Sequence, residues 1–435
     1  MADLDPGVEP ELDRFSRILP LPYRVSIIAV LGVWAWGVNL HYLYLIKIDV
    51  PALIRYPGRT SIHHAPHHAS VYRLATLLSI PLAISLLLFW AITHGSASAV
   101  VAWEILPQSY IFLLIILFIL PFYQLSKSGR YRFLSTLKRV SLGGLAQPQD
   151  GKFGDILLAD VLTSYAKVLG ELFVSICMFF SHDASSTAKP NRSCGGAILV
   201  PLLISIPSII RLRQCLIEFL RVRLGKQNSN GGWGGQHLAN ALKYSTAFPV
   251  IILSAIMRSP NHQEATGLSE KSLYHLWLFA VLVNSLYSFY WDVTKDWDLT
   301  LLTSRRSPPT RFPRPATPSR SSGSLYPYGL RPIRHFHTPN FYYIAILIDF
   351  ILRFTWSIKL SPHLDHFNDI EAGVFTMEVL EVARRWMWIF FRVETEWVRT
   401  IEAEDGGFSL TGNGAAGGGP MEILLGDMTG KIDDD

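Results

Sequence analysis

Residues 272–298 read SLYHLWLFAVLVNSLYSFYWDVTKDWD, an apolar segment of membrane-spanning length that ends in acidic residues. A transmembrane helix needs roughly 20 consecutive, mostly apolar residues. Asp292 and Asp296 are four residues apart at the end of this segment, so they share one face of a helix. Charge inside a membrane is expensive and usually marks an ion or substrate path. An ordinary helix end, where charged residues reach water, explains the same spacing equally well.

Apolar segments of this kind recur along the 435 residues, of which only 17% are charged. A soluble protein carries about 25% charged residues. We therefore predict an all-α polytopic membrane protein, a bundle of about 8–10 transmembrane helices. The nine expected spans cover residues 25–45, 74–96, 102–124, 156–180, 197–220, 243–258, 272–292, 341–360 and 372–392. Pro249 in the short sixth span predicts a broken or kinked helix, and such helices often border transport sites.

The net charge of +5 indicates basic cytoplasmic loops in a membrane protein, so no nucleic-acid partner is expected. Basic residues cluster at 127–139, 221–226 and 305–320, which predicts that these loops are cytoplasmic. Residues 181–196 then lie in a lumen or outside, where Asn191 begins a glycosylation sequon. Two of the three cysteines lie inside apolar runs, so the sequence implies no disulfide framework.

The chain divides into three predicted parts. Residues 1–22 form a short N-terminal tail, and residues 23–402 form the transmembrane domain. Residues 403–435 are Gly-rich and then acidic, which predicts a disordered C-terminal tail. Within the transmembrane domain, residues 303–335 are rich in Ser, Pro and Arg and are predicted to be a disordered cytoplasmic loop.

The last two expected spans carry more charge than lipid-facing helices do. Asp349 and Arg353 are four residues apart and can pair along one face, with Arg353 near the middle of its span. Glu381 can pair with Arg385, which leaves Arg384 about 100° away around the helix and free for another partner. An Arg without a partner in a low-dielectric site favours an anionic ligand, because its planar fork matches phosphate oxygens. Structural ion pairing between helices is the alternative.

Two further segments offer groups for an anion. The motif KYST at 243–246 places a Lys beside hydroxyls, although a Lys near lipid headgroups explains it as well. Asp160 could balance an Arg or accept a hydrogen bond from a protonated phosphate oxygen. The histidines at 63–68 have metal-like spacing, but their proline favours a polar loop, and the acid-x-acid pattern at 296–298 is frequent by chance. Without a nucleophile elbow or a phosphate-cradling Gly loop, we expect no metal, no cofactor and no enzymatic activity.

Several motifs, in order, resemble the EXS domain. They are LAD at 158–160, Pro207 with Arg211 and QCL at 214–216, NALKYST at 240–246, WDVTKDW at 291–297, ILRFTW at 351–356, EVARRW at 381–386 and FFRVETE at 390–396. That domain belongs to the eukaryotic phosphate exporters related to the xenotropic and polytropic retrovirus receptor. The match runs from about residue 25 to residue 400, and the motifs together make it specific.

The resemblance implies a phosphate-binding tunnel within the membrane. Carried over by motif, its residues are Asp160, Lys243, Tyr244, Asp292, Asp296, Arg353, Glu381, Arg384 and Arg385, with Trp356 near a gate. Thr163 stands where the exporters have Asn, and its hydroxyl can still hydrogen-bond phosphate over a shorter reach. The exporters also carry an N-terminal SPX domain, which the stretch before the first span here is too short to form.

The short form resembles the fungal branch of the family that takes its name from defective ER retention. The resemblance implies a Golgi phosphate transporter or channel, with the endoplasmic reticulum as a second location. It would move inorganic phosphate, a by-product of glycosylation, from the lumen to the cytosol and support glycosyltransferase retention. A non-transporting Golgi scaffold, which binds glycosyltransferases or their sorting adaptor, is the alternative. Membrane lipids and a second copy of the chain are further expected partners.

Overall fold

The structure is a computed structural model that describes eleven stretches of the chain. They are residues 12–54, 67–120, 127–147, 150–181, 185–225, 233–258, 267–302, 329–331, 333–336, 338–355 and 370–411. The helices are α1 (Arg14–Ile18), α2 (Leu21–Leu45), α3 (Val50–Leu53), α4 (His67–Thr93), α5 (Ala97–Ala102), α6 (Ile105–Ile119), α7 (Lys127–Lys138), α8 (Lys152–Ser164), α9 (Ala166–Ser181), α10 (Leu199–Arg223), α11 (Gly235–Ser245), α12 (Ala247–Arg258), α14 (Glu270–Trp291), α15 (Pro339–Arg353) and α16 (Ile370–Thr411). Two π-helical turns, η2 (Arg139–Gly143) and η4 (Asp292–Asp296), extend α7 and α14.

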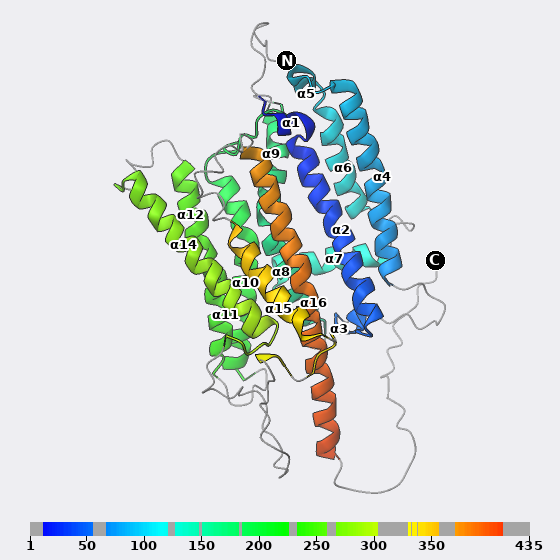
Figure 1. Cartoon of the computed structure of the whole chain (residues 1–435), viewed down its shortest axis with the longest axis vertical. Coiled ribbons are helices and arrows are strands. Elements are labelled where there is room, and N and C mark those ends of the chain that lie inside the picture. Colours follow the sequence, from blue (N-terminus) through cyan, green and yellow to red (C-terminus); the bar gives the residue numbers. More distant parts are fainter. Residues whose placement is uncertain are drawn as a thin grey trace.

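These helices form one elongated bundle, and no strand occurs in the stretches described (Figure 1). Six helices are long and apolar enough to cross a membrane, or seven if the bent pair α8–α9 counts as one. The chain is therefore an all-α polytopic membrane protein, as its apolar segments predict. The last two expected spans do not meet this criterion of length and apolar character. Helix α15 has only 15 residues, and α16 carries four charged residues between Glu378 and Arg385.

Two of the expected spans are broken. Helices α8 and α9 meet at Tyr165 with a bend of 61°, inside what the sequence presents as one span. Helices α11 and α12 are separated at Thr246, three residues before Pro249. Proline has no N–H to donate to the carbonyl four residues earlier, so a break at this point is expected. The predicted break near Pro249 is therefore confirmed, although Gly235–Arg258 still forms one span that bends by no more than 40°, whereas the bend at Tyr165 was not predicted.

Three predicted boundaries need correction. Arg14–Ile18 is a short helix packed against the bundle, with Ser16 buried, so the helical domain begins before residue 23. Leu330 and Arg331 are also buried, so the predicted disorder of 303–335 is wrong at that end; residues 303–328 lie outside the described residues. Helix α16 continues to Thr411, so the first part of the predicted tail is helical.

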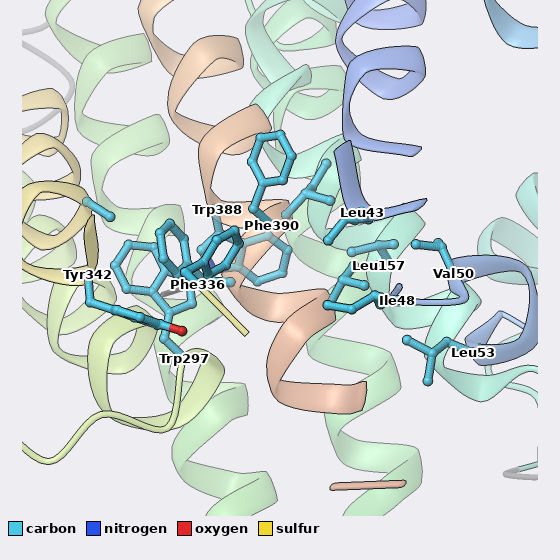
Figure 2. Packing of buried hydrophobic residues seen from close by; sticks show 14 of the residues in the cluster. Leu43, Ile48, Val50, Leu53, Leu157, Trp297, Phe336, Tyr342, Trp388 and Phe390 are labelled. Atoms are coloured by element: carbon cyan, nitrogen blue, oxygen red, sulfur yellow. The ribbon is translucent and has the colours of Figure 1, made fainter. Parts of the chain in front are cut away.

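Helix α16 is central to the bundle, because it packs against α1, α2, α3, α8, α15 and η4. Its middle is held by a large apolar core in which Trp297, Phe336 and Tyr342 lie on one side of the helix and Leu43, Ile48 and Leu157 on the other (Figure 2). Trp297 is fully buried there, with its ring centroid 5.0 Å from that of Phe391. Burial of Trp297 anchors the chain directly after η4, so this core positions the acids of η4 beside α16.

Glycines allow α2 to approach its neighbours closely. A side chain at Gly32 would collide with Tyr165, because its Cβ would lie 2.0 Å from the tyrosine hydroxyl oxygen. A Cβ at Gly37 would lie 2.9 Å from the ring of Tyr72 in α4. Small residues serve this purpose in membrane bundles, where van der Waals packing drives helix association. The contact at Gly32 fixes the α8–α9 bend against α2.

Candidate functional site

Ten charged side chains meet inside the bundle and form what we call the central ion cluster. Five are basic and five are acidic: Arg211, Lys243, Arg353, Arg384 and Arg385, and Asp160, Asp292, Asp296, Asp349 and Glu381. They come from α8, α10, α11, η4, α15 and α16. The formal net charge of the cluster is therefore zero. A balanced set of this kind tolerates burial better than any unpaired member would.

Asp292 is the hub of the cluster and is completely buried. Its carboxylate pairs with Lys243 Nζ at 3.0 Å, with a guanidinium nitrogen of Arg353, and with Arg384 Nη1 at 3.4 Å. The π-helical turn places Asp292 where three elements converge, with Trp297 N–H donating to the Asp292 carbonyl at 2.9 Å. Single π-turns of this kind frequently occur at functional sites.

Asp296, one turn further on, is the outer acid. Lys243 Nζ reaches its carboxylate at 3.4 Å, and the Asp296 side chain is 16% exposed, whereas that of Asp292 is fully buried. The two acids thus share Lys243 but differ in access to solvent. A path that has Asp292 inside and Asp296 nearer its mouth stays a prediction.

Helices α15 and α16 supply the guanidinium groups. Arg353 Nε lies 3.4 Å from Asp349, so the pair expected from the spacing is confirmed. Arg353 is, however, the last residue of α15 and not near the middle of a span. Trp356, the expected gate residue, lies outside the described residues. Arg384 Nη1 also pairs with Asp349, at 3.4 Å, which links the two helices.

The sequence-based pairing on α16 is wrong. Glu381 pairs with Arg384, with Nη2 to Oε1 at 2.5 Å, and not with Arg385. Arg384 therefore pairs with three carboxylates, more than any other cation of the cluster. Arg385 differs from the other cations in the bonds that it makes. The side-chain torsions of a long residue decide whether it reaches a partner three or four positions away, and spacing alone leaves both open.

Arg385 is buried but has hydroxyl partners in place of carboxylates. Its Nε donates to Ser164 Oγ at 2.9 Å, and its Nη2 donates to Thr163 Oγ1 at 3.1 Å. The guanidinium also lies 4.5 Å from the ring centroid of Trp388. Within the described stretches, no carboxylate is in ion-pair range of it. Neighbouring Glu381 has a side chain that is 39% exposed, so the protein does not completely enclose this part of the cluster.

A second part of the cluster joins α8, α10 and α11. Arg211 Nε lies 2.7 Å from Asp160, and Tyr244 donates to the same carboxylate at 2.5 Å. The guanidinium of Arg211 also stacks over the Tyr244 ring at 4.9 Å. Asp160 thus neutralises the charge of Arg211, which is one of the two roles predicted for it. Arg211 was not among the predicted site residues, although an Arg deep inside an apolar helix was a signal for it.

A separate set of charges lies near the start of α16, and we call it the end ion cluster. It consists of Arg24, Glu171, Arg192 and Glu371. Arg192 Nε and Nη2 bind Glu171 at 2.6 and 3.1 Å, while Nη1 and Nη2 bind Glu371 at 2.8 and 2.9 Å. Arg24 Nη1 completes the set with Glu371 at 2.7 Å. Sequence reasoning missed this cluster, because its members are far apart in the chain.

A disulfide joins Cys177 of α9 to Cys194 and closes the loop that carries Arg192. The absence of a disulfide framework predicted from the sequence is therefore wrong. An apolar setting at one cysteine does not prevent pairing, because only the fold brings its partner close. A disulfide persists in an oxidising compartment, which fits a luminal or external loop. Asn191 is exposed on this loop, and its glycosylation stays a prediction.

The fold and the site together define a polytopic α-helical membrane protein with a charged interior. The chain belongs to the EXS family, whose pattern matches residues 19–398. It is 29% identical over 405 residues to Protein ERD1 homolog 2 of Schizosaccharomyces pombe, across 86% of this chain and 96% of that protein. Protein ERD1 of Kluyveromyces lactis is 28% identical over 404 residues, across 90% of this chain and 97% of that protein. Human solute carrier family 53 member 1 is 28% identical over 395 residues, across 89% of this chain but only 51% of that protein.

Proposed function

We propose that this protein is a phosphate transporter or channel that moves inorganic phosphate from the Golgi lumen to the cytosol. The observation that carries the proposal is Arg385, a buried guanidinium held by two hydroxyls and without a carboxylate in ion-pair range in the described stretches. The side chain of its neighbour Glu381 is 39% exposed, so the protein does not completely enclose this part of the cluster. A guanidinium presents a planar fork that matches two phosphate oxygens, so an anion can take the place of the hydroxyls.

The rest of the central ion cluster would make binding reversible. Asp292 is shared by three cations, so an arriving phosphate can compete with it for Arg353, Arg384 or Lys243. Because the acids balance the bases, the site offers local positive groups without a large net positive charge. Conduction requires a site attractive enough to enter and weak enough to leave. No bond has to be made or broken in the transported ion, so we also propose that the protein is not an enzyme.

The Golgi location and the direction of transport rest on the family resemblance. The relatives named ERD1 match over nearly their whole length, and another relative is named a solute carrier. Supporting Golgi glycosyltransferase retention and protein glycosylation would follow from removal of phosphate from the lumen. The end ion cluster, beside the disulfide, would then face the lumen.

The test is phosphate flux in proteoliposomes that contain the purified chain. Arg385→Gln should lower the flux at least about tenfold, the change that corresponds to the loss of ~1.4 kcal/mol of binding to one ion. Arg353→Ala and Arg384→Ala should lower it further. Arg192→Gln, which removes an Arg of the end ion cluster, is the matched control and should leave the flux near that of the wild type. Undiminished flux in all three central variants would rule out the proposed site.

The same variants distinguish transport from the scaffold alternative. A scaffold would work through residues 303–328 or the C-terminal tail and would tolerate Arg385→Gln. In cells that lack the protein, glycosylation restored by Arg385→Gln but not by a chain without residues 303–328 would favour the scaffold. The reverse result would favour transport.

A further inference from the structure

A line of charged residues runs along one face of α16. Glu371, Glu378, Arg385 and Arg392 are spaced seven residues apart. Seven residues make almost two full turns of an α-helix, so these side chains lie on nearly the same face. Glu371 belongs to the end ion cluster and Arg385 to the central ion cluster, so Glu378 lies between the two clusters.

Glu378 is the one member of this line without an identified partner in the described stretches. The residue is 4% exposed, and its Oε1 is completely buried without a hydrogen-bond donor. The other three are all bound: Glu371 by two arginines, Arg385 by two hydroxyls and Arg392 by Glu396 at 2.9 Å. A buried polar atom without a partner is costly, so it calls for a ligand. For a carboxylate the smallest ligand is a proton.

The surroundings of Glu378 are mostly apolar. Val25 and Ile28 of α2, Val168 of α9 and Val382 of α16 form a buried cluster at this level, with Tyr165 of the α8–α9 bend packed against it. The charged groups that act on Glu378 are Glu171 and Lys167 of α9, Arg192 of the disulfide loop and Arg24 of α2. Both arginines, however, are already bound to Glu171 or Glu371. Their partner glutamates therefore offset the positive charge that the two arginines exert on Glu378, and the third cation, Lys167, is exposed.

We propose that Glu378 is a proton-binding site beside the phosphate path, next to the central ion cluster on its side toward the end ion cluster, and that phosphate passes it when it holds a proton. The inference rests on the proposed function and adds to it a proton as the coupled ion. An ionised Glu378 places a negative charge next to the route of an anion and repels it, whereas a protonated Glu378 does not. Intramembrane carboxylates commonly serve as proton relays in transporters. The proton binds to and leaves a carboxylate oxygen, so no other reactant is required.

The proposal predicts a particular pH dependence of phosphate flux in proteoliposomes. Wild-type flux should fall as the pH rises through the range in which Glu378 loses its proton, at most about tenfold per pH unit for one titrating group. Glu378→Gln mimics the protonated side chain and should keep its flux over the same range. Phosphate itself also changes charge with pH, but this affects wild type and variant equally. Glu270→Gln, at the exposed start of α14, is the control and should retain the wild-type profile.

A second measurement does not depend on transport. Infrared difference spectra of the reconstituted protein, recorded during a pH titration, should show the C=O stretch of a protonated carboxyl group. That band should be absent in Glu378→Gln and shifted in Glu378→Asp. A wild type that transports phosphate with the same pH profile as Glu378→Gln overturns the proton site while the proposed function stands. A wild type without phosphate flux refutes the proposed function, and an unchanged infrared band in Glu378→Gln then refutes the proton site separately.

Discussion

The two ion clusters on α16 are built from the same kinds of side chain but differ in how completely they are satisfied. In the end ion cluster, Arg192 makes two hydrogen bonds to each of two glutamates, and Arg24 completes the set. In the central ion cluster, one carboxylate, Asp292, serves three cations, and Arg385 has only hydroxyls. Bidentate arginine–carboxylate pairs are the stronger and more specific arrangement. Under the proposed function, the closed cluster would hold the fold and the open one would exchange ligands.

The largest expected effect on stability is at the hub of the central ion cluster. Asp292→Asn leaves three buried cations without their shared acid, and breaking a buried ion pair in this way costs ~3–5 kcal/mol. Thermal unfolding of the protein in detergent would measure the loss. Asp298→Asn is the control, because Asp298 has no ion pair in the described stretches and its φ of 54° is one that Asn also adopts. Equal unfolding temperatures for the two variants would contradict the role of Asp292.

The next effect concerns the disulfide that holds the end ion cluster. Cys177 and Cys194 are separated by 17 residues, and closing a loop of about that length stabilises a protein by ~3 kcal/mol. Replacement of both cysteines by Ser should lower the unfolding temperature and leave phosphate flux intact. A reductant should destabilise the wild type but not the double variant. Mass spectrometry without reduction should recover the two cysteine-containing peptides linked, and free thiols at both positions would contradict the pairing.

A smaller effect is expected for Arg192→Gln in the end ion cluster. The Arg192 side chain is 22% exposed, so water can replace part of its hydrogen bonding, and the expected loss is ~1–3 kcal/mol. Its flux, compared at equal amounts of folded protein, should match that of the wild type. A loss of flux as large as in Arg385→Gln would end the distinction between a structural cluster and a transport cluster.

The smallest effect on stability is expected at Arg385, the residue that carries the proposed phosphate site. Arg385→Gln removes two hydrogen bonds to hydroxyls but also removes a buried charge beside Arg384, so stability should change by less than ~1 kcal/mol. Arg385→Lys keeps the charge without the planar fork and should recover only part of the flux. Unfolding temperature and flux measured on the same samples test both statements. A strongly destabilised Arg385→Gln would show that Arg385 is a structural residue.

Much of the candidate site could be predicted from the sequence, because charge in an apolar segment is conspicuous. Asp160, Lys243, Asp292, Arg353 and Arg384 were all expected, and the structure brings them together. Their pairing was only partly predictable. The Asp349–Arg353 pair follows from its spacing, but the partner of Glu381 does not, since residues three and four positions away are both neighbours on a helix. The end ion cluster and the disulfide were missed, because their members meet only through contacts between distant segments.

The sequence by itself determined that this protein is a helical membrane protein with charges inside the bundle. Long apolar runs have one stable form in lipid, because every backbone polar group must be satisfied within the helix. Only the tertiary structure decided which of those charges are neutralised. Three cations converge on Asp292, and Glu371 takes both Arg24 and Arg192. Arg385 and Glu378 are left without such partners in the described stretches, because ion pairing depends on separations of a few ångströms between helices that sequence order does not specify.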